Sequence, residues 1–539
     1  MYDEQIWYRQ NGLAMVYCNK RSGEGEIIMS KRNTTDTCCL TLPLKLEKWQ
    51  EDRLSKRFEI VRQIYNTLVH AELKKLRQVE QSAEYRQIQV QLREMYQNNT
   101  TKTKEFRDIA NRRRKLLDAA GFREYDFKSA IKDYYKYFKE NIGSNVAIHG
   151  IAPLVWTAFE NKLYKNGKKV HYKRPGDIYS LRGYSVTGKS GGSEIMFRGT
   201  YVEWKGLKLP IKRLPDNDYE TAMLEYRVKY VRILRKPGKH KNYWYAQLSL
   251  EGKPVIKMNP VSNEPVHPIG SGAVGIDIGP QTIAYASQNE AGLLELASQV
   301  QNIERQKGLL QRKMERSRRD MNPENYMPDG TFRRGVKLTK NKSKHYCKLQ
   351  RELAYLQHRQ AETRKRQHIE LANHLLSLGD CFYVEDMKWL SLTHRAKETE
   401  ISEKTGRIKR KKRFGKSIAN KAPATLIGIL DTKCKSLGIP GVVKVPTIIK
   451  ASQYNHQSDT YEKKPLGQRW NDMPSGERIQ RDLYSAFLLQ HLEPDLTGYN
   501  KKMLAQDYPQ FVEYHNHVIN DLSMKPKTLA SMGIRRRVS

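Results

Sequence analysis

The chain has 539 residues, and its 97 Lys and Arg against 58 Asp and Glu give a formal net charge of +39. This imbalance indicates a polyanionic partner, with nucleic acid as the leading candidate. No run of about 18 apolar residues exists, and the first residues lack the basic and apolar regions of a signal peptide. We therefore expect no membrane partner and a cytoplasmic, bacterial nucleoid-associated protein that is not secreted.

The length predicts several domains, and residues 51–165 are predicted to be helical. Apolar residues recur there at intervals of three and four, with Lys and Arg on the other faces: Leu54, Phe58, Val61, Tyr65 and Leu68. Further helices are expected at about 81–97, 103–119 and 126–142. This region could be a simple helical bundle, but basic outer faces on an apolar core suit contact with a nucleic-acid duplex.

Residues 166–270 change to glycine-containing turns and alternating apolar and polar residues, which is typical of strands. Examples are the segments 194–198, 201–204 and 243–250. Together with residues 1–50, they are expected to form a β-barrel that the helical region interrupts.

Three acids stand in distinctive settings. Asp277 lies in an apolar strand at 273–279, and Glu385 ends a second apolar strand that begins at Cys381. Asp482 is expected near the N-terminal end of a helix, because apolar residues recur on the other side of that segment. A carboxylate in an apolar strand is costly unless its charge is compensated, so we expect the three to converge on one site.

A long basic helical excursion is predicted at 296–378, between the first two acids. Its second arm carries Arg359, Arg364 and Lys365. It could be a solvated helical hairpin or a nucleic-acid contact. Its place beside the carboxylates favours phosphate contact without sequence readout.

The densest basic run, at 407–413, includes Arg410 and Lys411. Such a run is usually a solvated loop, and here it is also a candidate lid or phosphate-holding loop near the active site. After it, a helix is expected at 422–437 and a buried strand at 441–445, a pair that fits a layer of helices against a mixed sheet.

The setting of the acids resembles the split RuvC-type, RNase H-like nuclease of TnpB and of the type V CRISPR effectors. Gly-Ile-Asp277-Ile-Gly is similar to the first motif of that family, and Val-Glu385-Asp-Met to the second. Asp482 with Ser485 and Ala486 is similar to the third, although Tyr484 and Leu488 replace its two asparagines.

The resemblance implies a multidomain α+β fold, in which an N-terminal wedge β-barrel is interrupted by a helical recognition domain and followed by an RNase H-like (RuvC) α/β nuclease domain. The implied parts are a wedge (1–50 and 166–270), a recognition domain (51–165), a nuclease (271–446 with the insertion 296–378, and 477–494), a target-nucleic-acid-binding insertion (447–476) and a C-terminal tail (495–539). The implied partners are a guide RNA and a target double-stranded DNA beside a short duplex motif.

Members of this family commonly carry a four-cysteine zinc ribbon between the second and third acids, but 447–476 contains no cysteine. His456 alone cannot build a tetrahedral site, so we expect no zinc. His515 and His517 are interpreted as helix-surface residues. Arg469 is a candidate for steadying the scissile phosphate, although an exposed loop arginine is the simpler interpretation.

Carboxylate oxygens suit Mg²⁺, with Mn²⁺ as a plausible substitute. We expect Asp277 to bridge two ions about 4 Å apart, with Glu385 and Asp482 each completing one, and Asp386 just outside them. No covalent intermediate is required. Two alternatives stay open: an RNA-guided DNA-binding repressor with weak or no cleavage, and a guide-independent resolvase or transposase.

Overall fold

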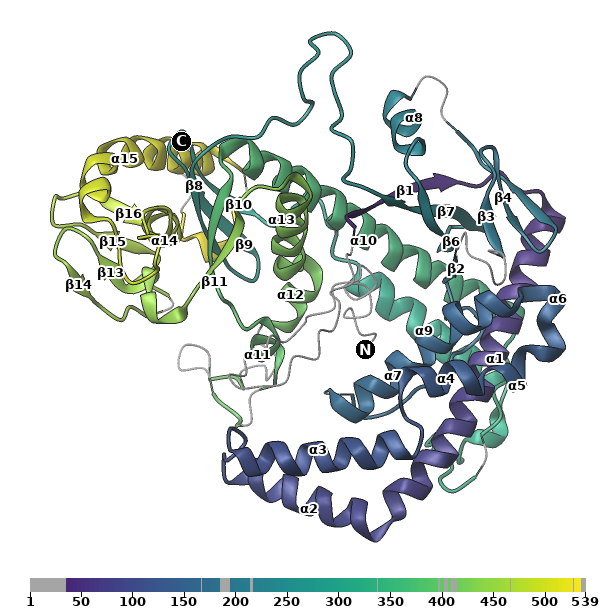
Figure 1. Cartoon of the computed structure of the whole chain (residues 1–539). Coiled ribbons are helices and arrows are strands. Elements are labelled where there is room, and N and C mark those ends of the chain that lie inside the picture. The colour runs from purple at the N-terminus through teal and green to yellow at the C-terminus, as the bar shows by residue number, and fades with distance from the viewer. Residues whose placement is uncertain are drawn as a thin grey trace, which may run out of the picture. The chain divides into compact units, whose positions relative to one another are not determined.

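The computed structural model is a mixed α+β structure with several separate sheets (Figure 1). It describes residues 35–165, 167–184, 194–213, 217–336, 338–395, 398–401, 406–408, 414–465, 467–526 and 528–534. Every helix and strand named below belongs to the unit Thr37–Ser539.

Helices occupy most of the chain between residues 48 and 164. They are α1 (Lys48–Gln81), α2 (Ala83–Gln97), α3 (Lys104–Ala119), α4 (Glu124–Ala130), α5 (Lys132–Tyr135), α6 (Lys139–Ile142) and α7 (Ala152–Tyr164), with a 3₁₀ turn at Lys136–Phe138 and a π-helix at Val146–Ile151. The apolar stripe expected on α1 is buried. The helix expected at 126–142 is instead divided into short pieces.

Two antiparallel sheets follow. The first has the order β1-β7-β6-β2 and comprises β1 (Thr37–Pro43), β7 (Asn242–Glu251), β6 (Val228–Pro237) and β2 (Ser180–Tyr184). The second comprises β3 (Ile195–Phe197), β4 (Tyr201–Trp204) and β5 (Leu207–Pro210), and the helix α8 (Asp218–Leu224) lies between β5 and β6 in the chain.

These described strands form open sheets, not the closed barrel that we expected, because the edge strands β1 and β2 do not pair with each other. Residues 1–34, assigned to the same barrel, lie outside the described residues. Trp204 links the second sheet to the helices, since its indole Nε1 donates to Ile142 O at 3.1 Å and Arg57 of α1 donates to its carbonyl oxygen.

The basic excursion forms a helical hairpin of α9 (Glu304–Asp320) and α10 (Lys344–Leu378), which contact each other and lie side by side in Figure 1. Only the beginning and the C-terminal third of α10 contribute buried side chains. The middle of α10 therefore presents its side chains at or near the surface.

A five-stranded mixed sheet has the order β10-β9-β8-β11-β12. Its strands are β8 (Ala273–Ile278), β9 (Thr282–Ala286), β10 (Ala291–Glu295), β11 (Cys381–Glu385) and β12 (Gly441–Val445). The pairs β8–β9 and β9–β10 are antiparallel, whereas β8–β11 and β11–β12 are parallel.

Helices cover both faces of this sheet. One face packs against the end of α10 and against α13 (Pro423–Leu437), which Gly438 ends in the left-handed conformation. The other face packs against α14 (Arg481–Gln490) and α15 (Lys501–Met524). The short helices α11 (Trp389–Thr393) and α12 (Gly415–Lys421) lie between β11 and α13 in the chain.

The segment 447–476 contains 3₁₀ turns at Thr447–Ile449 and Ala451–Gln453 and the short strands β13 (Tyr454–Asn455), β14 (Thr460–Tyr461) and β15 (Trp470–Asp472). β13 pairs with β14, and β15 pairs with β16 (Arg478–Gln480) directly before α14. The helix expected at 422–437 and the strand expected at 441–445 are present as α13 and β12.

The segment 495–539, described from sequence as a tail, contains the 24-residue helix α15. Its residues Leu504, Tyr508 and Phe511 belong to the core that covers the sheet. The prediction that His515 lies on a helix surface is wrong, because its side chain is buried and its Nε2 accepts from Gln480 N at 2.9 Å. His517 is exposed, as predicted.

Within the described residues, no single helix is both long and apolar enough to span a membrane. One pair of helical segments, Lys104–Ile142 and Val146–Tyr164, meets that test by length and composition together, with a bend of 117° between them.

Candidate active site

The alternation of side chains along β8 and β11 decides which face of the sheet carries the acids. Val274, Ile276 and Ile278 of β8 pack on the side of α10 and α13. Since successive side chains of a strand point to opposite faces, Gly275 and Asp277 face α14. Phe382 and Val384 of β11 likewise pack with α10 and α13, so Glu385 shares the face of Asp277.

The register brings these two acids to the same end of the sheet. β8 and β11 are parallel, and Ile276 pairs with Val384. The next residues along the two strands are Asp277 and Glu385. Neighbouring strands lie about 4.8 Å apart, so the two carboxylates stand side by side at the carboxyl ends of their strands.

The third acid comes from the helix on that face. Asp482 lies in the first turn of α14, where the Gln480 side chain caps the helix by accepting from Leu483 N at 2.8 Å. α14 lies very close to β8, because a Cβ on Gly275 would stand 1.9 Å from Ala486 O. The glycine therefore permits the approach of α14 to the acid-bearing strand.

The Asp277 carboxyl is close enough to the other two acids for their charges to affect its pKa. Burial, and next the negative charges of Asp482 and Glu385, raise the pKa of Asp277 well above its ordinary value. Arg481 and the Ser485 hydroxyl act in the opposite direction. Burial also raises the pKa of Glu385. The structure thus brings together the three acids singled out from the sequence.

Two arginines flank the third acid. Asp482 Oδ1 lies 3.8 Å from Arg469 Nη1 and 3.6 Å from Arg481 Nε. The position of Arg469 places a cation beside the carboxylates. Arg481 was missed from the sequence, although it is the chain neighbour of Asp482, because a basic residue in a strongly basic chain gives no distinct signal.

Among the described residues, no group of three or more Asp, Glu, His or Cys side chains is gathered closely enough to hold a metal ion as it stands. Asp482 pairs with arginines instead. The donors of the site are nevertheless all carboxylate oxygens, which suit Mg²⁺, and the mutual repulsion at Asp277 is what a bound cation would relieve. The donor chemistry therefore fits a divalent cation, provided that Asp482 exchanges its arginine partners for it.

The two residues that replace the family asparagines are built into the core. Tyr484 and Leu488 are buried, and the Tyr484 hydroxyl contacts His456 Nδ1 at 2.6 Å and accepts from His456 N at 3.0 Å. Burial lowers the pKa of His456 to about 4. His456 thus anchors the segment 447–476 to α14.

The remaining described candidates have other partners or are exposed. Arg359 and Lys365 are exposed on α10, whereas Arg364 Nη1 donates to Ala419 O at 2.8 Å. Asp386 Oδ1 lies 3.5 Å from Lys444 Nζ. Arg410 and Lys411 lie outside the described residues.

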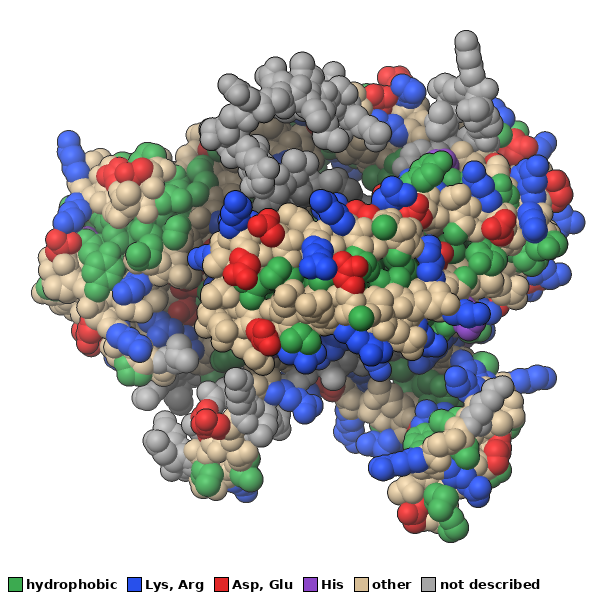
Figure 2. Space-filling model, turned by 60° about the horizontal axis from the view of Figure 1, so that its bottom comes forward, with side chains coloured by type: hydrophobic (Ala, Val, Ile, Leu, Met, Phe, Trp, Pro, Cys, Tyr) green, Lys and Arg blue, Asp and Glu red, His purple; other side chains and the backbone are tan. Residues whose placement is uncertain are grey.

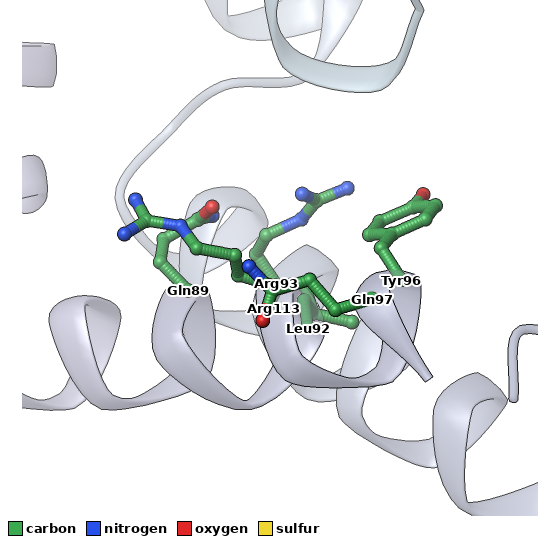
Figure 3. Close-up of a pocket in the computed structure, with 6 residues that line it drawn as sticks. All are labelled: Gln89, Leu92, Arg93, Tyr96, Gln97 and Arg113. Carbon is green, nitrogen blue, oxygen red and sulfur yellow. The ribbon is translucent and has the colours of Figure 1, made fainter. Parts of the chain in front are cut away.

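The helical region carries a separate basic cavity. A cavity of about 310 Å³ lies between α2 and α3. Figure 3 shows the two arginines and the exposed tyrosine that line it. It is lined by Gln89, Leu92, Arg93, Tyr96, Gln97 and Arg113. Lys and Arg side chains are also spread over the face in Figure 2, with acidic groups among them.

Comparisons with known proteins give matches only at the level of structure. No protein-family model matches the chain, and no curated protein matches its sequence. A Cas12f1–sgRNA–target DNA complex solved by cryo-electron microscopy is similar with a TM-score of 0.38 and 12% identity, over 86% of this chain and 99% of that chain.

A second cryo-electron microscopy structure, a CRISPR-Cas12f ternary complex, is similar with a TM-score of 0.22 and 13% identity, over 84% of this chain and 86% of that chain. Both of these solved structures are Cas12f complexes.

Proposed function

We propose that the chain is an RNA-guided DNA endonuclease that hydrolyses phosphodiesters of target DNA at Asp277, Glu385 and Asp482. The observation that carries the proposal is the meeting of three carboxylates, from two adjacent parallel strands and one helix, at the end of a mixed sheet with helices on both faces. This is the arrangement that the RuvC-type resemblance implies. A guide RNA and a target double-stranded DNA are the proposed partners, and the net charge of +39 favours such polyanions.

The chain's own residues would orient the reaction. Asp277 and Glu385 are fixed by strand register, and Asp482 by the capped first turn of α14. These three would hold Mg²⁺, which when bound supplies an activated water and stabilises the leaving 3′ oxygen. Arg469 and Arg481, which pair with Asp482, are placed to turn to the scissile phosphate once a cation occupies the carboxylates.

Basic helical surfaces would hold the nucleic acid. The exposed cations in the middle of α10 and the basic cavity between α2 and α3 carry Lys, Arg and tyrosine side chains and none of the three acids. Such surfaces neutralise phosphates without reading the sequence. We propose these surfaces for the guide RNA and its duplex with the target.

A second candidate function is an RNA-guided repressor that binds DNA without cutting it. The specific observation in its favour is the pairing of Asp482 with two arginines, together with Tyr484 and Leu488 at the positions of the family asparagines. If those pairs persist in the complex, Asp482 is neutralised and unavailable to a cation.

One experiment separates the two functions. The RNA that co-purifies with the protein is sequenced and used as the guide, with Mg²⁺ and a plasmid target that carries a randomised flank. We expect cut product from the natural chain and none from Asp277→Ala, while both bind the target equally. If the natural chain binds the target but gives no cut product, the nuclease proposal fails and the repressor function is supported. Cutting by Asp277→Ala would refute the assignment of the three acids.

A further inference from the structure

Two tyrosines of the β13–β14 pair and Tyr499, from the segment before α15, form a cluster of contacting rings. The rings of Tyr454 and Tyr499 are parallel, with centroids 4.5 Å apart and an interplanar angle of 8°. Tyr461 contacts Tyr454 at 4.9 Å with an angle of 41°. Tyr499 and Tyr454 are 8% and 3% exposed, whereas Tyr461 is 54% exposed. The stack therefore begins in the core and ends at the surface with Tyr461.

The inner members of the stack are held rigidly. The Tyr499 hydroxyl donates to Ile449 O at 3.1 Å, and the Tyr454 hydroxyl donates to Asp459 Oδ1 at 2.8 Å. Asp459 in turn pairs with Lys501 Nζ at 2.7 Å. Tyr461 lies directly opposite Tyr454 in the β13–β14 pair. A ligand that stacks on Tyr461 thus binds to a preformed surface, so binding costs little conformational entropy of the protein.

The stack lies beside the candidate active site. Glu385 pairs with Val445 in the β11–β12 register, and the Tyr499 hydroxyl bonds to Ile449, four residues after Val445. Burial, and with it the charge of Glu385, raises the pKa of the Tyr499 phenol. Burial and the Asp459 carboxylate raise the pKa of the Tyr461 phenol, and the nearby Lys501 ammonium acts in the opposite direction. Proteins bind single-stranded nucleic acid with exposed aromatic rings and nearby cations. The rings stack on the faces of the bases, and the cations contact the backbone phosphates.

We propose that Tyr461 is a stacking site for an unpaired base of the DNA strand that enters the carboxylate site. This inference rests on the proposed function and adds to it a residue that positions the substrate. The ligand is single-stranded DNA of any sequence, since stacking does not distinguish the hydrogen-bonding edges of the bases. Simple core packing does not account for the stack, because its outermost ring is the one that the fold leaves more than half exposed.

The test measures binding in a chain that cannot cut. Full-length Asp277→Ala protein with its co-purified RNA is titrated with single-stranded DNA that carries one 2-aminopurine, moved along the strand. We expect quenching at one or two neighbouring positions. Adding Tyr461→Ala should abolish that quenching and weaken binding about tenfold, the effect of losing one stacked base. The slope of affinity against salt should not change, because no charge is removed.

Further variants distinguish stacking from packing. Tyr461→Phe keeps an aromatic face and should bind as the parent does, whereas Tyr461→Leu keeps apolar bulk and should behave like Tyr461→Ala. Tyr125→Ala on α4 removes another exposed ring, 73% exposed, as the matched control. Unchanged quenching and affinity in Tyr461→Ala, or full binding by Tyr461→Leu, would overturn the inference.

The outcome is separable from the proposed function. If the natural chain does not cut but Tyr461→Ala still abolishes quenching, the nuclease proposal fails and the stacking site stands. If the natural chain cuts and the Tyr461 variants bind like the parent, the stacking site is refuted and the nuclease proposal stands.

Discussion

The carboxylate site and the hairpin of α9 and α10 use charge in opposite ways. In the first, a few charged groups are fixed by strand register, a helix cap and close packing, and each perturbs the others. In the second, many cations are spread along a helix whose middle contributes no buried side chain. We therefore expect single substitutions to act nearly all-or-none in the site and in small, additive steps on the hairpin.

After Asp277, the largest effect on cleavage is expected at Asp482. Asp482→Asn keeps the shape of the side chain but removes its charge, so guided cleavage should fall more than about 100-fold, beyond the effect of a residue that only orients a metal ligand. Binding of guide and target should not change. Asp52→Asn, which alters an exposed acid of α1 paired with Lys48, is the matched control. Equal cleavage by both variants would remove Asp482 from the site.

Gly275→Ala tests whether the close packing of α14 on β8, as well as the charges of the acids, determines the geometry of the carboxylate site. The new Cβ would stand 1.9 Å from Ala486 O, a backbone atom that cannot give way without moving α14. We expect a loss of more than about 3 kcal/mol in the free energy of unfolding, at the upper end for overpacking, together with lost cleavage.

The control for this variant is Gly308→Ala in α9, where no atom outside the helix's own neighbouring backbone lies within 4 Å of the added Cβ. An alanine there should stabilise the chain by about 0.5–1 kcal/mol, because glycine is a poor helix former. Denaturant unfolding of the two variants measures both effects. A tolerated alanine at position 275 would mean that α14 can shift without harm.

Among the buried residues of the hairpin, His368 is the titratable one. Its side chain is fully buried, and its Nε2 lies 2.8 Å from Lys421 O. Burial lowers its pKa to about 4. The unfolded chain, with an ordinary histidine pKa near 6.5, then binds more protons than the folded chain between pH 4 and 6.5, so stability is present above this window and is lost as pH falls through it.

The contribution of His368 to this loss is expected to reach at most about 3 kcal/mol. His368→Gln removes the titrating group and should flatten the dependence of unfolding free energy on pH in the window, whatever its own effect on stability. His517→Gln, at an exposed position, should leave the dependence unchanged. An identical pH profile for His368→Gln and the natural chain would contradict the burial of a neutral imidazole.

The site was more predictable from sequence than the hairpin for a physical reason. Alternation with period two assigns each residue of β8 and β11 to a face, so the apolar residues around Asp277 and Glu385 also place the acids. On a long basic helix, the same residue type can point outward or inward. His368 follows Arg364 and Lys365 in the sequence, yet it faces the core while Lys365 is exposed.

The long-range contacts of the C-terminal segment were not predicted. α15 covers the sheet and its His515 accepts from the residue before α14, but nothing local in the segment 495–539 signals this. The same holds for Tyr499, whose stacking partner Tyr454 lies 45 positions earlier in the chain. Local patterns identified the elements and the acids, whereas these contacts depend on tertiary packing.

The smallest expected effects belong to the exposed cations of α10. Arg359→Gln and Lys365→Gln each remove one charge, so each should lower the salt slope of duplex binding by about 0.9, the value for one phosphate contact, and the double variant by about twice that. Arg366→Gln is the control, because Arg366 already pairs with Glu370 at 3.6 Å. Binding of the guide–target duplex from 50 to 200 mM salt measures the slopes. If the slope of the double variant stays unchanged, these cations of the hairpin do not contact nucleic acid. The carboxylate site and the hairpin would then differ in function, and not only in how their charges are arranged.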